Sequence, residues 1–333
     1  MHFCRPLNAL LLVCSFAMAQ PAPPPATAVR SAGAAVAQEP ASSPADFQAE
    51  TSQAEASQRE TSFPEKENAL SADQIRALIQ RAAENDLANE KKLLNYTYFQ
   101  DTAERRMDSK GQVKSTETKS YEVMILYGSH VERLVAKDGK PLSAKEAAEE
   151  DKRIQKIVDK RKNETPQQAE KRVRQEEKDR EETRQFVREV GDAYNFRQVG
   201  VESLQGRAAY VIDAEPRPGF EPHSKEAKLL PKFRCRIWID KAEEQWVKVD
   251  AEAIDTVSYG LFLARVHKGS RVVVQQTRVN QEVWLPRQVS VKIDARVALL
   301  KNVDVAADVT YRDYRKFRSE IKIMPIDDTQ SQR

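Results

Sequence analysis

The C-terminal half of the chain alternates apolar and polar residues with a period of two. Odd positions are apolar from Phe233 to Ile239 while even positions are mostly charged, and the same alternation recurs over 289–295 and 303–311. Successive side chains of a β-strand point to opposite faces of its sheet. The pattern therefore predicts a sheet with one apolar and one solvated face, which is typical of antiparallel sheets.

The number and connection of these strands predict strong curvature. We expect about ten strands, joined by short turns such as 108–111 and 137–140 that make neighbours antiparallel. An open sheet of that size curls, and its concave apolar face then needs a cover. The covers that the sequence offers are a helix over 72–92, the loop 216–220, the stretch 259–264, and a bound apolar ligand.

The N-terminal helix has a clear start signal. Ser71 is a suitable N-cap, with Gln74 three residues later as its capping-box partner. Apolar residues then recur at helical spacing from Ile75, and the pattern ends near Leu94. We expect this helix to pack its apolar stripe on the sheet.

A charged segment of about fifty residues, 143–193, interrupts the strands. It is dense in helix formers of both charges, and Thr165 with Pro166 restarts the helix after a break. We interpret it as a helical hairpin with a thin apolar seam. Two interpretations stay open, a solvated spacer and a partner-binding or lid segment.

The first residues predict export. An apolar core over 7–19 ends in small residues at Ala17 and Ala19, so we expect a signal peptide at 1–19, cut after Ala19, and a periplasmic or secreted protein. The alternative is a lipoprotein anchored through Cys14. The Pro, Ala and Ser-rich segment 20–65 predicts a disordered tether. The folded domain then spans 66–325, and 326–333 forms a disordered tail.

Motifs for catalysis or metal binding are absent from the sequence. His130, His223 and His267 have no second ligand at metal-site spacing, and neither a nucleophile elbow nor a P-loop occurs. After signal cleavage Cys235 is the one remaining thiol, on the apolar side of its strand. The basic and acidic residues nearly cancel to a net charge of +3, and the sequence contains no uncompensated basic stripe. We therefore expect no enzyme, no cofactor, no metal and no nucleic-acid partner.

Two tryptophans break the solvated pattern of one predicted β-hairpin. The turn 241–244 joins its strands, and we expect the second strand, 246–252, to keep the parity of the first. Trp238 and Trp246 would then share the charged face. They either pack on each other, or on Arg236 and Lys248, as a cross-strand cluster, or form a contact patch for a partner.

Several short strings resemble a group of exported proteins from acidobacteria-like genomes, of the outer-membrane lipoprotein-sorting type. The strings are Gly206-Arg207, Pro216-Arg217-Pro218-Gly219-Phe220, Ile237-Trp238-Ile239-Asp240, Lys268-Gly269-Ser270 and Val283-Trp284-Leu285-Pro286. The resemblance covers about 70 to 320. It implies an α+β fold in which a strongly curved antiparallel half-barrel, like that of lipoprotein carriers, wraps around a helix and leaves an apolar cavity for acyl chains. The charged insertion and the tether are additions to that pattern.

The sequence thus predicts an envelope protein that binds a lipid, an acylated protein or another hydrophobic ligand on the concave face, and is at most peripheral to a membrane. The predicted binding residues are Phe233, Ile237, Val247, Val249, Val289, Val291, Ile293, Val305 and Val309. The alternative function is a protein–protein interaction module of the envelope, which would use the charged insertion to bind an envelope partner.

Overall fold

The computed structural model describes residues 69–108, 110–259, 264–297 and 301–317. The predictions for 1–19, 20–65 and 326–333, and most of the stretch 259–264, lie outside these residues. The described strands are β1 (Tyr96–Met107), β2 (Val113–Leu126), β3 (Ser129–Lys137), β4 (Lys140–Pro141), β5 (Tyr194–Leu204), β6 (Arg207–Pro216), β7 (Phe233–Asp240), β8 (Trp246–Ala253), β9 (Val257–Tyr259), β10 (Ala264–Val266), β11 (Arg271–Val279), β12 (Val283–Val297) and β13 (Lys301–Lys316).

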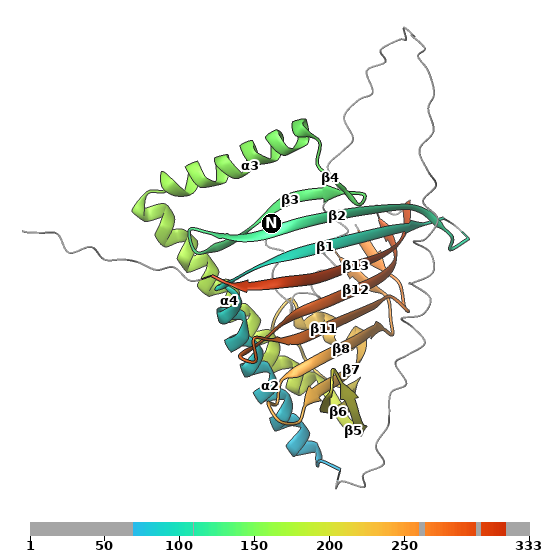
Figure 1. Ribbon diagram of the computed structural model, residues 1–333. Helices are drawn as coiled ribbons and strands as arrows, with labels where there is room; N and C mark the ends of the chain where they lie inside the picture. Colours follow the sequence, from blue (N-terminus) through green and yellow to red (C-terminus); the bar gives the residue numbers. More distant parts are fainter. Residues whose placement is uncertain (1–68, 109, 260–263, 298–300, 318–333) are drawn as a thin grey trace, which may run out of the picture.

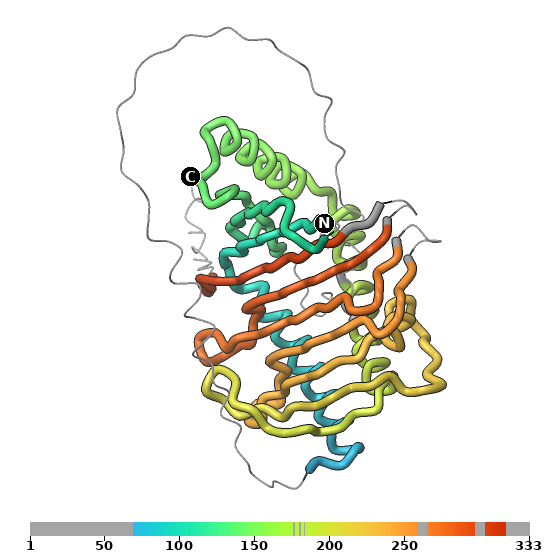
Figure 2. Tube along the Cα trace, turned by 90° about the vertical axis from the view of Figure 1, so that its right-hand side faces the viewer, coloured from blue at the N-terminus to red at the C-terminus, as the bar shows by residue number. Residues whose placement is uncertain are grey.

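These strands form one antiparallel sheet in the order β4-β3-β2-β1-β13-β12-β11-β8-β7-β6-β5, and β10 and β9 branch from β12. The order is linear, so the sheet is open. It is strongly curved, with the helices α2 and α4 on its concave side (Figure 1). Seen from the side, the strands are stacked and α2 crosses them (Figure 2). The fold is the predicted α+β half-barrel with a covering helix and a helical insertion.

The first covering helix, α2 (Ala72–Leu93), has the predicted capping box. Ser71 accepts a hydrogen bond from the Gln74 backbone N–H, and the Gln74 side chain accepts one from the Ser71 N–H. Its buried residues include Ile75, Leu78 and Ile79, which belong to the main core on the concave face. The predicted amphipathic helix is therefore confirmed, and it packs on the sheet as its pattern requires.

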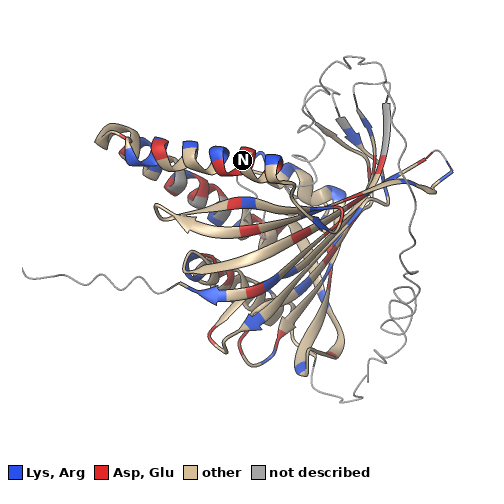
Figure 3. Cartoon of the chain, turned by 45° about the horizontal axis from the view of Figure 1, so that its top comes forward, with Lys and Arg blue, Asp and Glu red and all other residues tan. Residues whose placement is uncertain are grey.

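The insertion contains the two predicted helices, α3 (Ala144–Lys162) and α4 (Pro166–Ala193), with Thr165 as N-cap of the second. They diverge from the corner between them, so they do not form a tightly packed hairpin (Figure 1). Charges of both signs line both helices (Figure 3). α3 has no buried residue, whereas α4 becomes buried from Phe186 onward. Within the described part of the chain, no helix is long and apolar enough to span a bilayer.

A bulge in β8 corrects the predicted parity of that strand. Trp238 pairs with Lys248, but Ile239 pairs with Trp246, so Val247 is an extra residue. A bulge of this kind turns the following residues to the other face. Trp246 consequently lies with Ile239 in the concave core. Trp238 stays on the convex face, where the Lys248 Nζ lies 4.3 Å from its ring centroid, so the two tryptophans do not form one cluster.

Candidate ligand cavity

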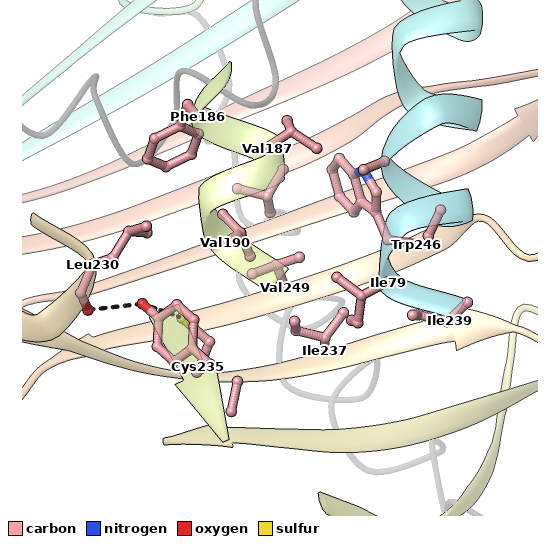
Figure 4. Close-up of a pocket in the computed structure, with 15 residues that line it drawn as sticks. Ile79, Phe186, Val187, Val190, Leu230, Cys235, Ile237, Ile239, Trp246 and Val249 are labelled. Atoms are coloured by element: carbon pink, nitrogen blue, oxygen red, sulfur yellow. Dashed lines mark hydrogen bonds between the residues drawn. The ribbon is translucent and has the colours of Figure 1, made fainter. Parts of the chain in front are cut away.

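A cavity lies between the concave face of the sheet and the helices α2 and α4. Its volume is about 140 Å³. The side chains around it are almost all apolar, and they come from elements far apart in the sequence (Figure 4). The lining residues are Ile79, Ala82, Ala83, Phe186, Val187, Val190, Tyr194, Ala214, Leu230, Cys235, Ile237, Ile239, Trp246, Val249 and Val274.

The floor of the cavity is made by paired residues of neighbouring strands. Ile237 of β7 is opposite Val249 of β8, and Ile239 is opposite Trp246. Directly opposite residues of an antiparallel pair project to the same face, so these four side chains form one continuous apolar surface (Figure 4). Ile239 is fully buried, which makes this floor part of the protein core as well as of the cavity.

The roof comes from α4 and the 3-10 helix η2 (Ala227–Lys232). Phe186, Val187 and Val190 of α4 face the cavity (Figure 4). One turn of the same helix is fastened by the buried Glu189 carboxylate, which accepts hydrogen bonds from the backbone N–H groups of His223 and Ser224 at 2.7 and 3.0 Å. This carboxylate therefore holds the end of α4 to the segment before η2.

Two polar side-chain atoms at the edge of the cavity have hydrogen-bond partners within the protein. The Tyr194 hydroxyl donates to the Leu230 carbonyl at 2.9 Å, and the Cys235 thiol lies 3.9 Å from the same hydroxyl. Burial raises the pKa of the Cys235 thiol to about 12. The thiol is thus a neutral, poorly nucleophilic group at neutral pH, as expected for a structural cysteine.

A buried polar cluster lies one turn along α2 from the cavity. The Asp86 carboxylate accepts a hydrogen bond from the Gln276 side chain at 2.7 Å. Gln245 donates to Gln276 at 3.0 Å and accepts from Asn89 at 2.9 Å. Desolvation raises the pKa of Asp86 to about 6, and the Gln276 hydrogen bond opposes part of that rise. The cluster fixes α2 to β11 and to the start of β8.

The nine predicted binding residues do not all line the cavity. Ile237 and Val249 lie in its wall. Phe233, Val289 and Ile293 are buried in the same core, and Val291 and Val309 are half-buried against it. Two others lie apart.

Val305 is half-buried opposite Ile293 and is not part of that core. Val247 is the extra residue of the β8 bulge and is buried outside both the core and the cavity wall. Trp246 takes the place that the alternation predicts for Val247.

The sequence pattern predicted the helix over 72–92 as a cover but did not assign the roof to α4. The apolar residues of α4 near its end, from Phe186 to Val190, were predicted as a thin seam between two helices, but they form the roof. Their spacing of three and four residues was a sufficient signal for burial. It did not reveal which surface they cover. Among the described residues, no group of three or more His, Cys, Asp or Glu side chains is arranged to hold a metal ion.

The fold and the cavity define an open antiparallel half-barrel whose concave face is roofed by helices. No family model matches this chain, and no curated protein sequence matches it.

Similar solved structures include a DUF1329 family protein from Desulfovibrio piger, with 11% identity, TM-score 0.29, and coverage of 75% of this chain and 95% of that chain. A LolA superfamily protein from Nitrosomonas europaea has 8% identity, TM-score 0.25, and coverage of 75% and 95%. An outer membrane lipoprotein-sorting protein domain from Vibrio parahaemolyticus has 11% identity, TM-score 0.26, and coverage of 74% and 95%. The fold assignment rests on the strand order and register described above.

Proposed function

We propose that this protein is an exported envelope protein that binds an apolar chain, such as the acyl chain of a lipid or lipoprotein, between α2, α4 and the sheet. The observation that supports the proposal is the cavity of about 140 Å³ with an almost wholly apolar wall. Protein interiors are normally close-packed, with few voids larger than a water molecule. An apolar cavity of this size is therefore a site where an apolar group gains contacts at little cost.

The cavity as it stands is small. An apolar cavity of roughly 150 Å³ accepts a benzene-sized group, whereas an acyl chain needs more room. Burial of each methylene contributes about 0.8 kcal/mol, so a chain of several methylenes stabilises an enlarged cavity once a covering helix moves. Binding of a whole acyl chain thus requires displacement of α2 or α4.

The experiment is mass spectrometry of organic extracts from the natively purified protein. We expect co-purifying lipid above the level of an unrelated periplasmic protein prepared in parallel. A matched pair on one helix locates the site: Val190→Phe fills the cavity and should reduce the lipid, while Val173→Phe adds the same volume at a position 54% exposed and should not. A lipid content equal to that of the unrelated control protein would exclude this function.

A second function, a protein–protein interaction module, is supported by the insertion. α3 has no buried residue, and Val173 on the outer half of α4 is an exposed large apolar side chain. Burial of this side chain by a partner would contribute favourable free energy to binding. Under this hypothesis Val173→Asp abolishes recovery of an envelope partner in pull-downs, and the lipid content of the protein stays at the control level.

A further inference from the structure

One helix joins the cavity to the exposed insertion. α4 contains 28 residues, which at 1.5 Å per residue is about 42 Å. Its last two turns form the cavity roof, while its first half is solvated. At its end the helix passes into β5 without a loop, between Ala193 and Tyr194. A displacement of the outer end is therefore transmitted along a continuous helix to the roof.

The outer end of α4 is tied to α3 at the corner between the helices. The Glu164 carboxylate accepts hydrogen bonds from Arg172 of α4 at 3.2 Å and from Arg161 of α3 at 3.4 Å. Charge-assisted, partly bidentate contacts of this kind fix orientation better than a single hydrogen bond. α3 and α4 therefore form one unit with a defined corner, which Figure 1 shows beside the edge of the sheet.

The far end of this unit is attached to the exposed edge of β3. Glu150 accepts a hydrogen bond from the Leu134 backbone N–H at 2.8 Å, and Arg153 donates to the Glu132 carbonyl. Glu150 and Arg153 are also paired with each other at 2.7 Å. These side chains satisfy backbone groups that an edge strand otherwise exposes.

Two ion pairs also join α3 to β3. Arg133 of β3 pairs with Asp151 at 2.7 Å, and Lys137 pairs with Glu146 at 3.0 Å. No residue of α3 is fully buried, and its apolar residues Ile154, Ile157 and Val158 are half-buried. An attachment with little apolar burial is weak and depends on salt, because exposed ion pairs contribute little and are screened. α3 is consequently the part of the unit that detaches first.

We propose that α3 and α4 act as a lever, in which release of α3 from the β3 edge lifts the end of α4 from the cavity. The proposal rests on the proposed function for its biological meaning, since it makes ligand entry depend on whatever competes for the charges of α3. Because charged side chains hold α3 to β3, the partner that would compete for them is a charged surface of another protein. The lever itself is a property of the chain and is measurable without a ligand.

Cys235 provides an internal reporter, because it lines the cavity and is the one cysteine among the described residues. The experiment measures the rate at which N-ethylmaleimide labels Cys235 in the full chain, with the site assigned by mass spectrometry of its peptide. The test variant carries Glu150→Ala and Arg153→Ala. The control carries Glu170→Ala and Arg174→Ala, which removes a pair of 2.7 Å on the exposed face of α4.

We expect the test variant to be labelled about fivefold faster than the wild type, because it lacks the charged hydrogen bonds to the β3 backbone, and the control to be unchanged. Raising salt from about 0.05 M to about 0.5 M should speed labelling of the wild type, and also of the test variant, because both keep the Arg133–Asp151 and Lys137–Glu146 pairs that salt screens. Equal rates in test and control variants would overturn the lever. If the test variant does not fold, the wild type alone decides: a labelling rate of Cys235 that does not change with salt would also overturn the lever.

The two proposals fail separately. Faster labelling combined with lipid extracts at control level would retain the lever and remove the ligand role. Co-purifying lipid with unchanged labelling would retain the ligand role and remove the lever.

Discussion

The Asp86 carboxylate of α2 accepts a hydrogen bond from the Gln276 side chain of β11 at 2.7 Å, across a separation of 190 residues. Both residues are almost fully buried. The carboxylate also accepts a hydrogen bond from the Gln245 side chain at 3.4 Å. A buried carboxylate held by neutral amides is costly when charged, which makes this contact sensitive to pH.

Asp86→Asn should remove one pH dependence of stability. Burial raises the pKa of Asp86 from 3.8 to about 6, so between these values the folded state binds more protons than the unfolded state. The free energy of unfolding therefore falls as the pH rises through this window, by about 3 kcal/mol for two pKa units, and is level above it. Urea unfolding of both proteins from pH 4 to pH 7 should show that the free energy of unfolding of the variant rises relative to that of the wild type as the pH increases. Parallel curves would contradict the prediction.

Asp240→Asn should have the opposite pH behaviour. Burial alone would raise the pKa of Asp240, but hydrogen bonds from Arg207 at 2.7 and 2.8 Å and from backbone N–H groups lower it below 3.8. Its stabilisation is then present above pH 4 and lost as the pH falls through the lowered pKa. At pH 7 the variant should lose about 2–3 kcal/mol. The loss should shrink toward pH 3 in the same urea measurements; a constant difference would show that the ion pair is not responsible.

Val249→Ala should enlarge the cavity, and Val211→Ala should not. Val249 lines the cavity, whereas Val211 is buried in the convex cluster with Trp238. Both substitutions remove two methyl groups and should cost about 1–2 kcal/mol. Only Val249→Ala should strengthen binding of an apolar fluorescent probe, measured by titration. Equal affinities in the two variants would place the probe outside the cavity.

The capping boxes of α2 and α4 should differ in their effect on the stability of the whole protein. Ser71→Ala removes the cap of α2, which packs on the core, and should lower the free energy of unfolding by about 1 kcal/mol. Thr165→Ala removes an equivalent cap at the solvated start of α4. That loss should fray the helix locally and leave the thermal midpoint almost unchanged. Circular dichroism melts measure both effects, and equal shifts would mean that the outer half of α4 folds with the core.

Local patterns were sufficient to predict most of the elements. Alternation indicated β7, β12 and β13, and the capping residues Ser71 and Thr165 marked two helix starts where the structure has them. These features depend on residues within a few positions of one another. The period of two and the capping hydrogen bonds act within a single strand or turn, so neighbouring residues are enough to determine them.

Tertiary structure alone decided which side chains meet in the cavity. The bulge at Val247 turns Trp246 to the concave face, and strand pairing rather than alternation determines where a bulge occurs. The end of α4 covers the sheet because α2 and η2 offer it an apolar surface, and its helical spacing could not specify that partner. The strand faces and helix starts therefore came from the sequence, through short-range geometry. The composition of the cavity came from long-range packing, because it depends on which distant surfaces bury one another.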